Sequence, residues 1–214
     1  NTEDGIIHSG CVGGGGESQE TNFAYACGVQ NTGMPGEHVR FRFQKTMEPC
    51  HIFVLASFSS RYILILLEMV RLHRVKTVLL PYVSPMRRLL LFQSQKEEMR
   101  NPEYMNFMAH PYTFLRQAGV EQVYLIYGNG VPLTGEQKDM APGHYFEPAE
   151  PKELHRIWEL EGQYVPAVKA GYIIASDWLF YFGHYGEDLN CGGSRPGKLL
   201  SSTLAMFQGP LHTD

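Results

Sequence analysis

The strongest constraint on the fold is a strand–helix–strand pattern between residues 50 and 82. Ile52–Ser57 is a short continuous apolar run, typical of a strand buried on both faces. Ser59 or Ser60 can then cap a helix over 62–73, whose apolar residues recur at helical spacing at Ile63, Leu66, Leu67 and Val70. Lys76–Pro81 follows as a second strand that ends in proline. This order predicts a βαβ unit with two parallel strands and a right-handed crossover.

The rest of the chain predicts more strands before this unit, and both helices and strands after it. We expect strands at 5–10, 22–29 and 39–44, then helices over 84–100 and 102–118. The second helix should begin after Asn101, with Pro102 in its first turn, and end at Gly119. A buried strand over 120–127, a long loop over 128–151, strand-like stretches within 163–182 and a last strand at 199–207 complete the prediction. The order favours an α/β fold with sheets covered by helices.

Composition supports one folded core and excludes several classes of protein. The 214 residues are 43% apolar and 19% charged, with a net charge of −4, which argues against disorder and against nonspecific nucleic-acid binding. The basic residues Arg71, Arg74, Lys76, Arg87 and Arg88 could still form a local patch for nucleic acid, but a structural use at helix ends is favoured. The most apolar region, 52–70, is interrupted by polar residues and predicts no membrane span.

The four cysteines and nine histidines form no local motif. None of the cysteines forms Cys-x-x-Cys, and their sparse spacing favours a reducing, cytoplasmic location. No two histidines lie within five residues of each other, so a local metal clip is excluded. The glycine run that ends at Gly16-Glu17 lacks the Lys of a phosphate-binding loop, and Gly-x-Ser-x-Gly is absent. Any catalytic or metal site must therefore be assembled from distant segments.

The turn after the first strand of the βαβ unit is the predicted site. Ligands of α/β layers bind at the carboxyl ends of strands, which places Ser57–Tyr62 there. The hydroxyls of Ser59 and Ser60, the Arg61 guanidinium and the helix N-terminus would suit an anion. Helix capping beside a solvated arginine explains the same residues without a ligand.

The stretch Ile52-Phe-Val-Leu-Ala-Ser-Phe-Ser-Ser-Arg-Tyr-Ile63, with Val75-Lys-Thr-Val-Leu-Leu-Pro-Tyr82 after a helix, resembles the metallo-β-lactamase fold family. In that family a buried strand ends in His-x-His-x-Asp-His, and a helix and a Val-x-x-Val-x-Leu-Pro strand follow. The resemblance implies an αββα sandwich. It also places Ser57 and Ser59 on the first two histidines, Arg61 on the aspartate and Tyr62 on the third histidine. These residue types are poor zinc ligands, so the family's two-metal site is not expected.

Two weaker similarities extend the alignment toward the ends of the chain. Gly5–Gly10 resembles the family's early strand that ends in Asp-x-Gly, with His8 in place of the aspartate. Leu199–Phe207 resembles a later strand that leads to a Gly-Asp ligand, which Asp214 would represent. The resemblance therefore predicts a single metallo-β-lactamase-like domain over 1–214. The missing initiator Met and the family's last histidine, which would lie beyond residue 214, predict that this domain is part of a longer protein.

Three functions follow from this comparison. The first is a non-catalytic domain that acts as scaffold, sensor or interaction module, with protein partners or other domains of a parent chain. The resemblance further implies a prokaryotic defence or nucleic-acid-processing assembly. Aromatic residues at 145–146 and 178–185 would suit an interface or a core. The sequence predicts no cofactor for this function.

The second function is an active zinc- or manganese-dependent hydrolase of phosphodiesters or esters. It would need a metal site rebuilt from scattered residues, foremost His8, His184 and Asp214, with His51, His110, His144 and His212 as further candidates. The third is an anion- or nucleotide-binding α/β module that uses the Ser57–Tyr62 turn. Metal content separates the second function from the others, and an Arg61→Ala variant separates the third.

Overall fold

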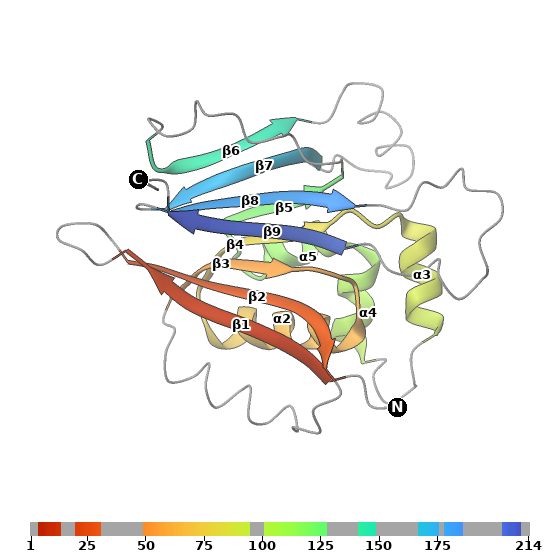
Figure 1. Cartoon of the computed structure of the whole chain (residues 1–214). Coiled ribbons are helices and arrows are strands. Elements are labelled where there is room, and N and C mark those ends of the chain that lie inside the picture. Colours follow the sequence, from red (N-terminus) through yellow and green to blue (C-terminus); the bar gives the residue numbers. More distant parts are fainter. Residues whose placement is uncertain are drawn as a thin grey trace.

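The computed structural model describes residues 4–13, 20–30, 49–94, 101–127, 141–148, 167–175, 178–185 and 203–210. Side chains are described within these ranges except at 4–6, 27–30, 184–185 and 203–210. The predicted strand at 39–44 and the predicted loop at 186–197 lie outside the described residues. Within the described residues, four helices accompany a sheet of nine strands (Figure 1).

Eight of these strands follow one another in the sheet in the order β1-β2-β3-β4-β5-β7-β8-β9, and β6 pairs with the free side of β7. Neighbours from β2 to β7 run parallel, whereas β1–β2, β6–β7, β7–β8 and β8–β9 are antiparallel. The strand bounds are β1 (Asp4–Val12), β2 (Thr21–Gln30), β3 (Cys50–Leu55), β4 (Val75–Pro81), β5 (Gln122–Ile126), β6 (Gly143–Pro148), β7 (Ala167–Ala175), β8 (Trp178–Tyr185) and β9 (Thr203–Pro210).

The predicted βαβ unit is confirmed. Helix α2 (Ser60–Leu72) begins after Ser59 and connects β3 to β4, and these strands pair in parallel from Cys50 opposite Val75 to Val54 opposite Leu79. Strand β5 adds to β4 in parallel, as expected for a third buried strand. The α/β class is therefore correct.

The predicted helix over 102–118 is wrong in one respect, because it is two helices. Helix α4 (Pro102–Ala109) begins as expected, with the Asn101 side chain accepting a 2.7 Å hydrogen bond from the Tyr104 amide. Proline at 111 disfavours helical geometry at His110, whose φ of −140° and ψ of 67° break the chain direction. Helix α5 (Pro111–Gln117) then runs to the turn at Gly119, which has the positive φ of 93° that glycine tolerates best.

Two further boundaries differ from the prediction. Helix α3 (Pro85–Gln93) is followed by Ser94, and residues 95–100 of the longer predicted helix lie outside the described part. The predicted loop over 128–151 contains β6, which pairs with β7. Gly171 permits this close pairing, because a Cβ at that position would lie 2.6 Å from the Phe146 Cα.

The sheet curls strongly enough to place its two halves face to face. Five strand spacings separate β2 from β8, or on the order of 24 Å in a flat sheet. Yet the rings of Phe23 on β2 and Phe180 on β8 have centroids only 5.3 Å apart. In Figure 1, β8 and β9 accordingly lie in front of β4 and β5. The curl buries the face of β3 and β4 that the helices do not cover.

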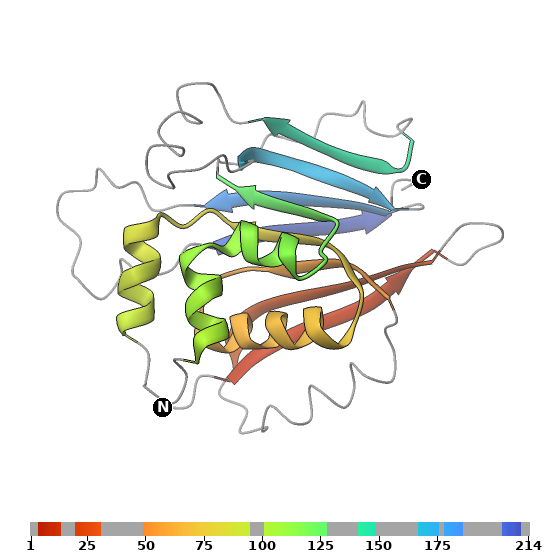
Figure 2. The ribbon, with the colours of Figure 1, turned by 180° about the vertical axis from the view of Figure 1, so that it is seen from behind.

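The core is divided by the central strands into two clusters. One joins α2, α3, α4 and α5 to one face of the sheet, through residues such as Phe53, Leu66, Phe107 and Leu115. The other lies between the two halves of the sheet, contains Phe23, Phe180 and Phe182, and includes no helical residue. The described helices thus cover one face (Figure 2). The second helical layer of the expected αββα sandwich is not found among the described residues.

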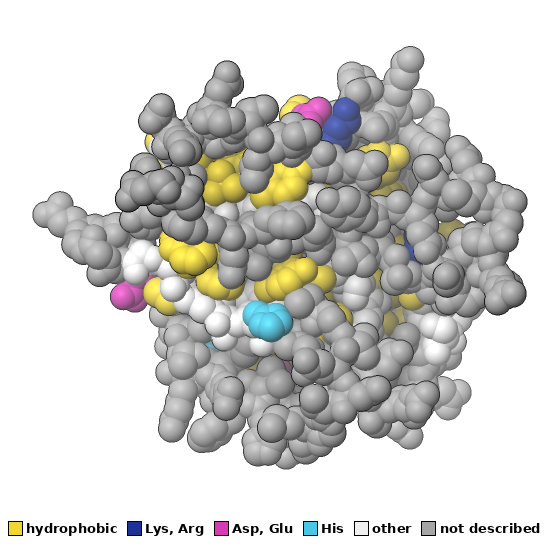
Figure 3. Space-filling model, in the orientation of Figure 1, with side chains coloured by type: hydrophobic (Ala, Val, Ile, Leu, Met, Phe, Trp, Pro, Cys, Tyr) yellow, Lys and Arg dark blue, Asp and Glu magenta, His cyan; other side chains and the backbone are white. Residues whose placement is uncertain are grey.

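The side of the molecule that carries β1, β8 and β9 has a low density of charge among its described side chains. In the space-filling view, the coloured side chains on this side are mostly hydrophobic, and the acidic and basic ones lie mostly toward its margins (Figure 3). One such pair is Lys169 and Glu147, with Nζ and Oε1 3.5 Å apart. None of the described helices has the length and apolar character needed to span a membrane.

The inter-sheet cluster generates the first prediction. Phe180→Ala should lower the free energy of unfolding by about 3–5 kcal/mol, because it removes a fully buried ring and leaves a cavity. Urea denaturation measures the change. Met105→Ala, on an exposed part of α4, should change it by no more than about 0.5 kcal/mol. Equal effects of the two substitutions would contradict the curled arrangement.

Candidate functional site

The predicted site residues lie together at the carboxyl edge of the parallel strands. Strand β3 ends at Leu55, and the Ala56 amide extends its pairing with β2 through a 2.9 Å hydrogen bond to the Ala26 carbonyl. Residues 57–59 then lead directly into α2. The sequence therefore predicted this local arrangement correctly.

This turn is packed into the helix-side core. Phe58, Ser60 and Tyr62 are buried, with Phe58 and Tyr62 each only 4% exposed. The Phe58 ring lies against Phe107 of α4, with centroids 5.9 Å apart. Ser57, Ser59 and Arg61 are half-buried, and Ser59 occupies the N-cap position without a hydrogen bond from its side chain to the first turn. Aromatic packing, rather than a described cavity, is the dominant feature of this turn.

The metal candidates are not brought together within the described part of the chain. His8 is exposed on β1 and is in register with Tyr25, which is in register with Val54, three residues before Ser57. His184 lies in β8, but its side chain, His212 and Asp214 are outside the described residues. Among the described side chains, no three His, Cys, Asp or Glu residues gather closely enough to hold a metal ion.

Several residues of the predicted basic patch are engaged in structural interactions. Arg71 forms an ion pair with Glu68 at 3.1 Å, and Arg74 forms one with Glu121 at 2.8 Å. Arg88 is 3% exposed. These contacts favour the structural explanation of the patch.

Arg88 connects three segments of the helical layer. Its guanidinium donates hydrogen bonds of 2.7 Å to the Met108 carbonyl, 2.6 Å to the Val83 carbonyl and 3.1 Å to the Ala109 carbonyl. Met108 and Ala109 end α4, where the helix dipole is negative and a cation is favourable. The contacts hold α3 and α4 beside the segment that follows β4.

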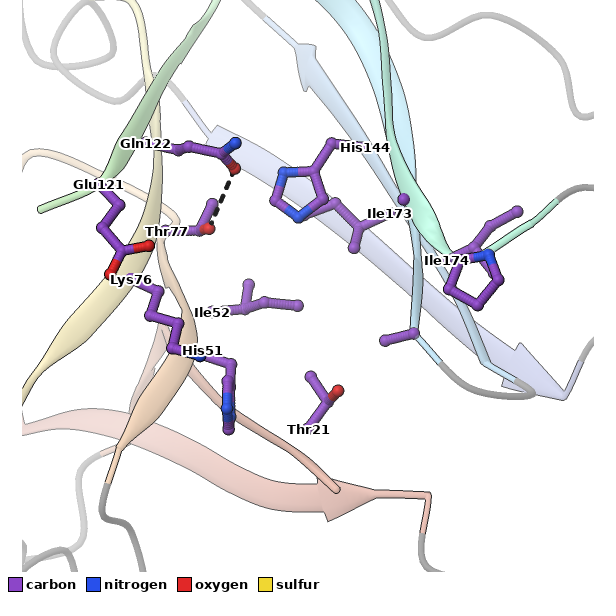
Figure 4. Close-up of a pocket in the computed structure, with 13 residues that line it drawn as sticks. Thr21, His51, Ile52, Lys76, Thr77, Glu121, Gln122, His144, Ile173 and Ile174 are labelled. Carbon is purple, nitrogen blue, oxygen red and sulfur yellow. Dashed lines mark hydrogen bonds between the residues drawn. The ribbon is translucent and has the colours of Figure 1, made fainter. Parts of the chain in front are cut away.

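A cavity lies at the opposite, amino edge of the parallel strands. Its volume is about 460 Å³, and it opens between the two halves of the curled sheet (Figure 4). The start of each parallel strand contributes polar side chains, and β6 and β7 form the facing wall. The lining residues are Thr21, His51, Ile52, Lys76, Thr77, Glu121, Gln122, Pro142, Gly143, His144, Ile173, Ile174 and Ala175. A volume of this size is typical of a site for a small molecule.

The ring of His51 is held in one tautomer. The backbone amide of Asn22 donates a 3.0 Å hydrogen bond to His51 Nδ1, so the proton of the neutral ring lies on Nε2. Burial lowers the pKa of His51 below its usual 6.5, and the nearby Lys76 ammonium lowers it further. His51 is therefore a neutral hydrogen-bond donor at pH 7, and while it keeps this hydrogen bond it has no lone pair for a metal.

The facing wall carries a second histidine. His144 Nδ1 and the Tyr124 hydroxyl are 3.2 Å apart. Desolvation lowers the pKa of His144 and raises that of Tyr124, so both groups are neutral at pH 7. The cavity thus combines two neutral imidazoles with an ammonium, hydroxyls and an apolar wall.

The charges around the cavity are not balanced within it. Glu121 is the carboxylate of the lining, and it is already paired with Arg74. Lys76 has no ion-pair or hydrogen-bond partner among the described residues, and in Figure 4 its side chain extends toward His51. The edge therefore presents an uncompensated positive charge beside a neutral donor.

The sequence prediction missed this cavity because it searched the carboxyl ends of the strands. A signal was present, since each parallel strand begins with polar residues, as in Pro49-Cys-His51, Lys76-Thr77 and Glu121-Gln122. Such residues are ordinary where a strand meets solvent. Only the facing wall from β6 and β7 makes them line a cavity.

Comparisons of this chain with known protein families, with curated proteins and with solved structures find no match.

The state of His51 predicts how stability depends on pH. The unfolded chain binds a proton at His51 near pH 6.5 and the folded chain only at lower pH, so the free energy of unfolding should fall as pH drops below about 6.5. His51→Gln, which keeps a hydrogen-bond acceptor, should reduce this fall. Urea titrations at several pH values measure it.

Lys76→Met should also raise the pKa of His51, because it removes a repelling charge. Proton NMR of the imidazole measures this pKa, and Lys169→Met is the control, since Lys169 lies on β7 and pairs with Glu147. An unchanged pKa in Lys76→Met would contradict the proximity of the two groups.

Proposed function

We propose that this chain is a non-catalytic domain of the metallo-β-lactamase type that acts by binding. The parallel β3–α2–β4 unit and the two facing halves of the sheet support such a frame. The turn between β3 and α2 corresponds in the alignment to the segment that holds the metal ligands in that family. The frame is thus used without its usual metal chemistry.

The observation that carries the proposal is the packing of that turn. Tyr62 and Ser60 are buried, and Tyr62 belongs to the helix-side core. Phe58, between the aligned positions Ser57 and Ser59, rests on Phe107. A hydrolytic centre needs metal ligands and room for substrate at this position, whereas aromatic packing fills it with side chains that support the fold.

An unusual helix supports a role in binding a protein partner. Met86, Leu89 and Leu90 of α3 are 66%, 48% and 50% exposed, and their spacing places them on one side of the helix. The opposite side carries Leu91 and the charged Arg88 into the interior. Because exposed apolar groups of this kind mark interaction surfaces, α3 is the proposed contact element.

Metal analysis tests the absence of catalysis. After incubation with zinc and with manganese and removal of excess ion, the protein should retain well under one equivalent per chain and show no hydrolysis of bis(p-nitrophenyl) phosphate. Elemental analysis and absorbance give the two readouts. Retention of about two ions per chain would instead support a two-metal hydrolase.

Arg61→Ala provides a further control on the same turn. If the turn is structural, the variant should bind inorganic phosphate no differently from the wild type, as calorimetry would show. Phosphate binding that is lost in Arg61→Ala would favour the alternative anion-binding function of the Ser57–Tyr62 turn.

Substitutions on α3 test the exposed surface. Leu89→Gln together with Leu90→Gln should change the free energy of unfolding by no more than about 0.5 kcal/mol per position, because both side chains already contact solvent. The same double variant should bind less of a fluorescent apolar dye. Leu91→Gln, on the buried side of the helix, should cost at least about 2 kcal/mol. Similar costs for both sides would contradict the proposed contact surface.

A further inference from the structure

We propose that the cavity at the amino edge of the parallel strands binds a small organic anion, with its charged group between Lys76 and His51 and its apolar part against Ile52, Ile173 and Ile174. The inference does not depend on the family of the frame. It rests on the charge, the hydrogen-bond donors and the shape of the cavity.

The charge distribution selects an anion. The Arg74 guanidinium engages the Glu121 carboxylate at 2.8 Å, so Glu121 is not available to neutralise Lys76. Lys76 has no partner of its own among the described residues that line or surround the cavity. A carboxylate or phosphate would complete this pairing through a charge-assisted hydrogen bond.

The hydrogen-bond geometry points the same way. Because Asn22 donates to His51 Nδ1, the neutral ring has a proton to donate from Nε2. Lys76 and His51 lie on the same side of the cavity in Figure 4. Their proximity lowers the pKa of His51 in the empty cavity, and an anion between them would remove this repulsion.

The remaining surface favours an apolar body on the ligand. Ile52 of β3 faces the inter-sheet core, and Ile173 and Ala175 of β7 belong to the same buried cluster. Thr77 and Gln122 lie between the charged side and His144, with Thr77 Oγ1 3.5 Å from Gln122 Oε1. An aromatic or branched acid would contact both kinds of surface.

Two explanations without a ligand account for less. Cations near helix C-termini stabilise the helix dipole, and α2 ends at this edge, but Arg71 and Arg74 already occupy that role. A metal site would need His51 as a ligand, and its Nδ1 is occupied by the Asn22 amide. Neither explanation requires Lys76 to extend into the cavity.

The test uses benzoate and phenyl phosphate as anionic probes and benzamide as a neutral probe of the same shape. Calorimetry should show saturable binding of at least one anion and much weaker binding of benzamide. Lys76→Met should weaken the anion about 10- to 100-fold, as expected for one charge-assisted hydrogen bond. Lys76→Arg should restore most of the affinity, and Lys169→Met should leave it unchanged. The preferred anion identifies the head group.

The pH dependence provides an independent measurement. The groups that face His51 are Lys76 from β4, Glu121 from β5 and His144 from β6. Since a bound anion raises the pKa of His51, affinity should increase between about pH 7.5 and about pH 5.5, and His51→Gln should remove most of that increase. Proton NMR of His51 should show the shift on saturation. Equal binding of benzamide, or no response of His51 to either anion, would overturn the proposal.

Discussion

The contact between the two halves of the curled sheet is the interaction on which the rest of the structure depends. Phe23 and Phe180 meet across the inner face, although five strand spacings separate their strands. This contact covers one face of β3 and β4, and the helices cover the other, so the central strands can be apolar on both sides. Polar residues of these strands are thereby confined to their ends. Both candidate sites lie at those ends for this reason.

The two ends of the parallel strands have opposite character. In most α/β sheets the carboxyl ends bind ligands, yet here that edge is closed by Phe58, Phe107 and Tyr62. The amino edge is open, because β6 and β7 stand away from the starts of β3, β4 and β5 and leave a cavity of about 460 Å³. A sheet can place function at either end when the layers beyond the strands determine which end is filled. The distribution of aromatic residues decides it in this chain.

Helix α3 shows a second inversion, in which a charged side chain is buried and apolar ones are exposed. A buried guanidinium is costly unless it is hydrogen-bonded, and Arg88 meets this requirement with three carbonyl oxygens. These contacts orient the helix so that Met86, Leu89 and Leu90 face outward. The exposed face is thus a consequence of a specific internal interaction. The same interaction secures α4, which supports the closed carboxyl edge.

The sequence by itself determined the local elements whose signals lie within a few residues. The apolar run of β3, the helical spacing of α2 and the Asn101 cap each identified an element correctly, and His110-Pro111 carried a break that the prediction overlooked. The pairing of β6 with β7 and the cavity could not be predicted in this way. His51, Lys76 and His144 are far apart in the chain, and each is unremarkable at its own position. Only the tertiary structure decided that they line one cavity, because the curl of the sheet depends on side chains that meet across it rather than on any local pattern.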